Sequence, residues 1–263
     1  MEFYKSLLLD KWDILLMIVV VIQSTILASL QHPRWKAFMI TLPFPFTVAV
    51  LAVGKPIDTT NILGLLLLMV FTHGVRIFHN KFKFHIIAAI LASTIAYCLL
   101  AKLLGNFVVQ SNLSFYVSTA LVYAVAISAI YLFPHKHEQG QKSLMPIRAK
   151  LFVIIAVVYC IMLMKKSLTG FVTVFPMVGV IAAYESKSTL WTLCRQVPTV
   201  LLTLGAMIAA IFILQNIIGL YFALAAGWVV FLIALTPFFR HQLKNSEHPV
   251  DDIKPEPDFQ LDS

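Results

Sequence analysis

Long apolar runs alternate with short polar clusters along the chain, up to about residue 240. The runs are about 17 to 25 residues long, which is the length an α-helix needs to cross the hydrocarbon core of a membrane. The clusters between them are charged or turn-forming, as in HPRWK (32–36) and KPID (55–58). The pattern predicts an all-α polytopic membrane protein with about nine transmembrane helices. The predicted spans are 13–31, 37–54, 59–79, 84–104, 113–133, 149–165, 168–184, 190–214 and 216–239.

The end of the chain carries two further signals. The last two spans are separated only at Gln215 and Asn216, which predicts a tight helical hairpin there. From His241 onward the composition changes, because the chain becomes acidic and contains several prolines. We therefore expect residues 241–263 to form a disordered cytoplasmic tail.

Composition agrees with a membrane protein. Hydrophobic residues make up 60% of the 263 residues and charged residues only 12%, with a mean hydropathy of +0.88. A soluble domain is nearer half apolar and a quarter charged. One soluble core of this size cannot hide the excess, so the outer surface must be apolar as well, and a lipid bilayer is the expected surrounding partner.

The basic residues predict an orientation rather than a nucleic-acid partner. The net charge of +8 comes from side chains scattered over short connections, not gathered on one soluble face. Most of the 20 Lys and Arg residues follow the odd-numbered spans. Because basic loops stay in the cytoplasm, the N-terminus is expected outside and the C-terminus inside.

Two segments far apart in the chain resemble each other. AFMITLPFPFTVAVLA (37–52) matches GFVTVFPMVGVIAA (170–183), with Phe38 over Phe171 and Pro43 over Pro176. The spans that follow each segment also correspond in order. Five spans separate the starts of the two copies, so the second copy would enter the membrane upside down, as in many secondary transporters. The alternative is chance likeness between two membrane helices.

The repeat predicts a 4+1+4 architecture. A first four-helix unit would cover 1–104, and a second would cover 149–240. Residues 105–148 would supply a connecting helix and a cytoplasmic loop, and 241–263 the tail.

The second half resembles a known family. Its segment follows the pattern G-x-V-x-x-F-P-x-x-x-x-I-A-x-Y, which is similar to the signature of the GlpM-like small inner-membrane proteins. The resemblance covers about 149–239, while the first half shares only the Phe/Pro core. It implies a multi-pass protein of the bacterial inner membrane in which two four-helix units are fused. The matching residues are Gly170, Val172, Phe175, Pro176, Ile181, Ala182 and Tyr184.

The matched prolines are the first candidate site. A proline inside a helix removes one backbone donor and crowds the carbonyl four residues earlier. Matched interruptions in two halves of a transporter often expose backbone groups to a ligand. The alternative is a kink packed by neighbouring helices. The candidate binding residues are Pro43, Phe44, Pro45 and Phe46 in the first half and Phe175, Pro176 and Met177 in the second.

Four ionisable residues form a second candidate group. His73 and Arg76 are three positions apart and so share one face of a helix. Glu185 and Arg195 flank the connection between the seventh and eighth spans. Charged groups in a membrane are costly and often functional, so together these residues could form a polar gate for an anionic or zwitterionic solute. Membrane anchoring and structural pairing are the alternative.

These features favour a transporter or permease of a small, unidentified solute. A non-transporting scaffold or accessory subunit of an envelope or metabolic complex is the alternative, with the acidic tail as its docking peptide. No catalytic, dinucleotide or phosphate-loop motif is present, so we expect neither an enzyme nor a cofactor. The HKHE segment (135–138) lacks further ligands in fixed geometry, so no metal site is expected. A homo-oligomer or another membrane protein is a further expected partner.

Overall fold

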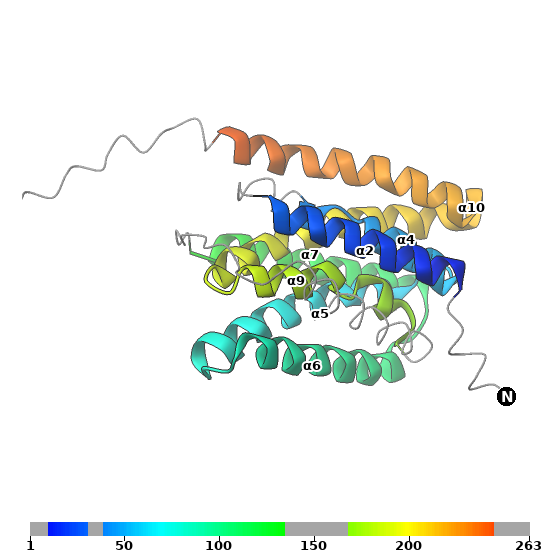
Figure 1. The fold of residues 1–263 in the computed structure, drawn as a ribbon. Helices are drawn as coiled ribbons and strands as arrows, with labels where there is room; N and C mark the ends of the chain where they lie inside the picture. Colours follow the sequence, from blue (N-terminus) through cyan, green and yellow to red (C-terminus); the bar gives the residue numbers. More distant parts are fainter. Residues whose placement is uncertain (1–9, 31–38, 135–167, 245–263) are drawn as a thin grey trace, which may run out of the picture.

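The protein is described by a computed structural model for residues 10–30, 39–134 and 168–244. These residues form helices and connecting turns, and no strand occurs among them (Figure 1). The elements are α2 (Lys11–Ser29), α4 (Phe44–Val53), α5 (Thr59–Arg76), the π-helix η1 (Ile77–Lys81), α6 (Ile86–Phe107), α7 (Asn112–Leu132), the 3₁₀-helix η2 (Thr169–Val174), α9 (Met177–Glu185) and α10 (Leu190–Lys244).

The helices have the length and composition of membrane spans. Four of the described helical segments are long and apolar enough to cross a bilayer: Thr59–Lys81, Ile86–Phe107, Asn112–Leu132 and Leu190–Phe238. Large apolar side chains are exposed on the outer helices, such as Leu99 on α6 at 63% and Val117 on α7 at 60%. The all-α membrane class is therefore confirmed. The count of nine spans stays a prediction, because span 149–165 lies outside the described residues.

The break in α10 differs from its predicted position. Ile211 and Gly227 would be about 24 Å apart in a straight helix, yet a Cβ on Gly227 would lie 2.7 Å from Ile211 Cγ1. The helix therefore folds back on itself, and Figure 1 shows its yellow and orange parts side by side. The turn is at Gly219, whose φ of 78° suits glycine. The predicted hairpin is confirmed, but its predicted break at 215–216 is wrong.

The sequence placed a helix break at Gln215 because this residue is polar, but its side chain forms a tertiary contact. Its amide nitrogen donates to the carbonyl oxygen of Ile57 at 2.8 Å, and its amide oxygen accepts from the Ile57 N–H at 2.8 Å. This amide satisfies both backbone groups of a residue in the α4–α5 connection. A polar residue inside the apolar run thus marks a tertiary contact and not a loop.

Two contacts show that α5 and the first part of α10 are antiparallel. The end of α5 meets the start of α10, because the Arg76 guanidinium lies 4.1 Å from the Trp191 ring centre. At the other end, Gln215 of α10 bonds Ile57, just before α5 begins. Both helices pack against α7, and α5 also packs against η2.

The 3₁₀-helix η2 is held by polar side chains of α5 and α6. Asn61 Nδ2 donates to Thr173 Oγ1 at 2.8 Å and to the Gly170 carbonyl at 3.3 Å. The fully buried Tyr97 donates its hydroxyl proton to the Phe171 carbonyl at 2.8 Å. In an apolar interior each carbonyl left without a donor would cost free energy. These side chains therefore allow η2 to depart from a regular α-helix.

Replacing Gly170 by alanine should destabilise the protein by about 1 to 3 kcal/mol. A Cβ at this position would overlap Thr60 Oγ1 and lie 2.7 Å from Asn61 Oδ1, so the clamp on η2 would have to shift. The measurement is thermal unfolding of the purified protein in detergent. Gly105→Ala is the matched control, because its nearest neighbour would be 3.9 Å away. Equal stability of the two variants would contradict the close packing described here.

Candidate functional site

Two short apolar helices are interrupted at the matched prolines. Met39–Val53 breaks at Leu42 and Pro43, and Gly170–Glu185 breaks at Phe175 and Pro176. Pro43 is the N-cap of α4 and Pro176 is the N-cap of α9. The prolines thus mark helix starts rather than kinks within a continuous helix.

Pro45 is not at an N-cap position, unlike Pro43 and Pro176. It lies in the first turn of α4, where a backbone N–H would have no intrahelical acceptor. Proline is tolerated there without breaking the helix. Pro45 is therefore compatible with α4, and the interruption of this segment lies at Leu42–Pro43.

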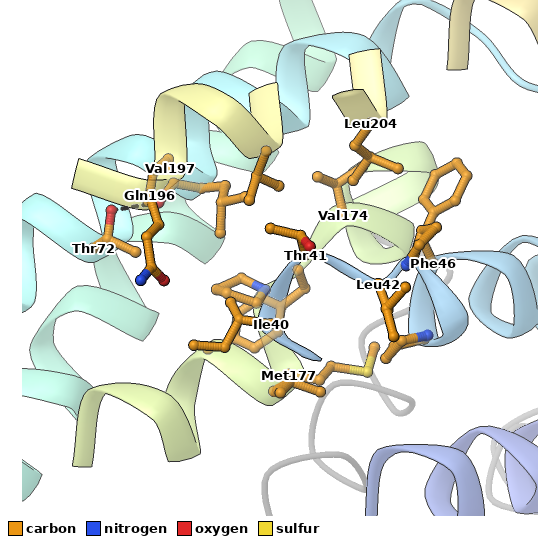
Figure 2. A pocket seen from close by; sticks show the side chains of 18 of the residues that line it. Ile40, Thr41, Leu42, Phe46, Thr72, Val174, Met177, Gln196, Val197 and Leu204 are labelled. Atoms are coloured by element: carbon orange, nitrogen blue, oxygen red, sulfur yellow. Dashed lines mark hydrogen bonds between the residues drawn. The ribbon is translucent and has the colours of Figure 1, made fainter. Parts of the chain in front are cut away.

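Both interruptions border one cavity of about 100 Å³ (Figure 2). Residues from α2, the segment 40–46, α5, η2, α9 and the first part of α10 line it. Figure 2 shows Thr41, Val174, Met177 and Gln196 arranged around this space. Most of the wall is apolar, and Leu68, Leu193 and Leu204 are typical of it.

Gln23 replaces a backbone donor that the chain lost at the first interruption. In an α-helix the Met39 carbonyl would accept from the N–H of residue 43, and Pro43 has none. Gln23 Nε2 donates instead to the Met39 carbonyl at 2.6 Å and to the Leu42 carbonyl at 3.1 Å. The side chain is only 3% exposed. A buried amide on α2 therefore makes this break possible in an apolar surrounding.

Two residues that line the cavity carry a side-chain oxygen without a hydrogen-bond donor among the described residues. These oxygens are Oε1 of Gln23 and Oε1 of Gln196, and both are buried atoms. Both amino hydrogens of Gln23 have acceptors, which fixes the orientation of that amide. Buried polar atoms usually have hydrogen-bond partners, so these two oxygens are exceptions among the described residues.

The cavity also borders the starts of two helices. The first N–H groups of a helix have no intrahelical acceptor and carry a partial positive charge. Neither α4 nor α9 has a side-chain cap on these groups. Pro43, Pro45 and Phe46 of the first helix start and Pro176 to Gly179 of the second line the cavity. The Met177 N–H already donates to the Phe175 carbonyl at 2.7 Å, and the prolines at both helix starts have no N–H, so few free backbone donors remain there.

The structure brings together six of the seven candidates near the prolines. Phe44 is the exception, because its ring packs against Trp228 on the second part of α10, with 4.9 Å between ring centres. Trp228 also donates to Thr47 Oγ1 at 2.9 Å. The residues of this group that line the cavity are Pro43, Pro45, Phe46, Phe175, Pro176 and Met177.

None of the four ionisable candidates is among the described residues that line the cavity. His73 and Arg76 do share a face of α5, but this face meets aromatic rings. The His73 ring lies 5.2 Å from that of Phe133, and Arg76 lies over Trp191. His73 directly follows Thr72, the last cavity residue of α5, and Arg76 lies about one turn further along the helix.

The other two ionisable candidates lie on either side of the α9–α10 turn. Glu185 is buried at the end of α9, and Arg195 is half-buried in the second turn of α10. A polar gate made of all four residues stays a prediction.

The two glutamines at the cavity were not among the candidates. Both are single amides within long apolar runs, at positions 23 and 196. Such residues are commonly interhelical hydrogen-bonding groups. Only the three-dimensional arrangement reveals that both residues line the same cavity.

Comparisons of this chain with known protein families, with curated proteins and with solved structures gave no match. The resemblance to GlpM-like proteins stays a prediction. Among the described residues, no group of three or more His, Cys, Asp or Glu side chains could hold a metal ion.

Adding a methyl group at the cavity should be tolerated better than adding one in the packed core. Val200→Ile extends a side chain of the cavity wall, and we expect unchanged or slightly higher stability, by up to about 0.8 kcal/mol. Val122→Ile is the matched control, because Val122 is fully buried in α7 away from the cavity, and overpacking there costs about 1 to 3 kcal/mol. Thermal unfolding in detergent measures both. A larger loss for Val200→Ile would contradict the presence of free space.

Proposed function

We propose that the protein transports a small solute across the bacterial inner membrane, with the cavity between α4 and α9 as its binding site. One observation carries the proposal: two interrupted helices, distant in sequence, begin at matched prolines on the same cavity. Interrupted helices that offer backbone groups to a central site are characteristic of secondary transporters. A chain that only supports other proteins has no need of such a site.

The depth of the cavity supports this proposal. Leu68 lines it and lies nine residues into the 23-residue segment Thr59–Lys81. At 1.5 Å per residue, Leu68 is about 14 Å from the start of that segment. The hydrocarbon core is about 30 Å thick, so the cavity would lie close to the middle of the membrane. Substrate sites of transporters lie near this level.

The directions of the helices support the proposed inverted repeat. The α4 helix ends at the α4–α5 connection, where Ile57 bonds Gln215. The α9 helix ends at the α9–α10 connection, and the start of α10 lies beside the end of α5. Because α5 spans the bundle between these two places, α4 and α9 run from the cavity toward opposite faces. Two copies inserted upside down relative to each other would have this relation. In this scheme the N-terminus is outside and the C-terminus is cytoplasmic.

Single cysteines beside the two interruptions should react with a membrane-impermeant thiol reagent. The variants are Phe46→Cys and Val178→Cys in a chain whose three native cysteines are replaced by alanine. Both positions line the cavity, so an aqueous pathway would expose each of them to at least one side. Labelling of vesicles of known orientation, from each side in turn, is the measurement. Val122→Cys is the control that should stay unlabelled, because that position is fully buried away from the cavity.

If Phe46→Cys and Val178→Cys both stay as unreactive as the control, the prolines only shape packed helices. The scaffold function would then be favoured. The tail that it would use for docking, 241–263, lies almost entirely outside the described residues.

Replacing Pro176 by alanine should abolish or strongly reduce solute uptake while the protein remains in the membrane. Alanine restores an N–H and permits a continuous helix from η2 into α9, which would remove one helix start from the cavity. The measurement is osmotic swelling of proteoliposomes in small solutes. Pro237→Ala is the matched control, because Pro237 is an exposed proline within α10 and is distant in sequence from every cavity residue. Equal swelling rates for both variants and the unmodified protein would exclude a role for the interruption.

A further inference from the structure

We propose that the turn between α5 and α6 binds the headgroups of anionic phospholipids at the cytoplasmic surface of the membrane. The turn consists of residues 80–85, with the sequence NKFKFH, and all six side chains are exposed. Figure 1 shows it at one end of the bundle, between α5 and α6. None of these six residues lines the cavity, so the proposal does not depend on the transport function.

The position of the turn brings it to the lipid headgroups. It joins the candidate membrane spans Thr59–Lys81 and Ile86–Phe107, which are separated by only four residues. Four residues extend over at most about 14 Å, and the chain has to leave and re-enter the bilayer within that length. The turn therefore stays at the level of the headgroup layer.

Aromatic and basic residues alternate in the turn. Phe82 and Phe84 are 56% and 45% exposed, and Lys81 and Lys83 are exposed beside them. Exposed phenyl rings are unfavourable in water, whereas ammonium groups are unfavourable in hydrocarbon. Both are stable together at the boundary, where the rings can contact acyl chains and the ammonium groups can contact phosphates.

The phenyl rings form one cluster with a residue of η1. Phe78 stacks on Phe84, with 5.8 Å between ring centres and 12° between ring planes. The Phe82 ring lies 6.0 Å from that of Phe78 and 6.3 Å from that of Phe84. These contacts join the turn to the end of the α5 segment and give it a continuous apolar side.

The backbone around Lys83 is held in an uncommon conformation. Lys83 has a φ of 60°, in the left-handed region that residues other than glycine rarely adopt. The next residue fixes it there, because the Phe84 N–H donates to the Phe78 carbonyl at 3.0 Å and the Phe84 carbonyl accepts from His79 Nδ1 at 2.8 Å. π-Helices and left-handed residues are both frequent at functional sites. The turn thus presents its lysines from a preformed backbone.

The charge at this end of the bundle favours an anionic partner. The chain has no Asp or Glu between Asp58 and Glu138, so α5, η1, α6 and α7 offer no carboxylate to the lysines. Arg76 adds a further cation just before η1, where it lies over Trp191. Glu185 at the end of α9 is buried. Basic clusters beside membrane spans attract anionic lipids, and each Lys or Arg near the surface raises the affinity about fivefold.

The test measures lipid binding to the full-length protein in detergent by native mass spectrometry. The probes are dioleoylphosphatidylglycerol, which is anionic, and dioleoylphosphatidylcholine, which is zwitterionic. The double variant Lys81→Gln/Lys83→Gln keeps the length of both side chains and removes two charges. It should weaken binding of phosphatidylglycerol about 25-fold, or about fivefold for each lysine, and leave binding of phosphatidylcholine unchanged.

Lys55→Gln/Lys102→Gln is the matched control. Both lysines are exposed, and they lie in the α4–α5 connection and near the end of α6, at the opposite ends of the two helices from the turn. The net charge falls by the same amount, yet phosphatidylglycerol binding should be retained. An equal loss in the two double variants would overturn the proposal, because total charge and not the turn would then determine binding.

Phe82→Ala/Phe84→Ala tests the apolar side of the turn. This variant should weaken the binding of both lipids by a similar factor, since a contact with acyl chains does not depend on headgroup charge. Unchanged binding of both lipids would contradict the proposed contact. Inorganic phosphate should not displace phosphatidylglycerol, and displacement would identify a phosphate site instead of a lipid site. If the unmodified protein binds both lipids equally and the lysine variant changes neither, the turn is not a lipid site and an acidic protein partner is favoured.

Discussion

The arrangement depends on one requirement, which is that every backbone carbonyl in an apolar surrounding needs a donor. Each interruption of a helix releases carbonyls, and in this protein a side chain from another helix meets each released group that we can trace. Gln23 bonds the Met39 and Leu42 carbonyls, Asn61 bonds the Gly170 carbonyl, and Tyr97 bonds the Phe171 carbonyl. Thr173 also donates to the Gly170 carbonyl, at 2.7 Å, and each of these hydrogen bonds lowers the cost of interrupting a helix in an apolar surrounding.

The same requirement connects packing with the candidate site. A side chain that donates to a released carbonyl has to approach the interruption closely, so the helix that carries it is drawn to the cavity. Gln23 illustrates the consequence, because it donates to two carbonyls at the first interruption and also lines the cavity.

The sequence was informative where the signal is local. The apolar runs predicted the helices, and the matched prolines Pro43 and Pro176 coincide with the two interruptions. Signals that depend on a distant partner were misread or missed. Gln215 looked like a loop because its partner, Ile57, is 158 positions away. Gln23 and Gln196 looked like ordinary interhelical contacts because nothing local reveals an unsatisfied oxygen.

The two interruptions are not equivalent, although their sequences match. Gln23 donates to carbonyls at the first, and Asn61, Thr173 and Tyr97 donate to carbonyls at the second. Close packing adds to the second, because a Cβ on Gly64 would lie 3.0 Å from Val174 and Gly170 has no room for one. The second interruption is therefore fixed by tight packing against α5 as well as by hydrogen bonds.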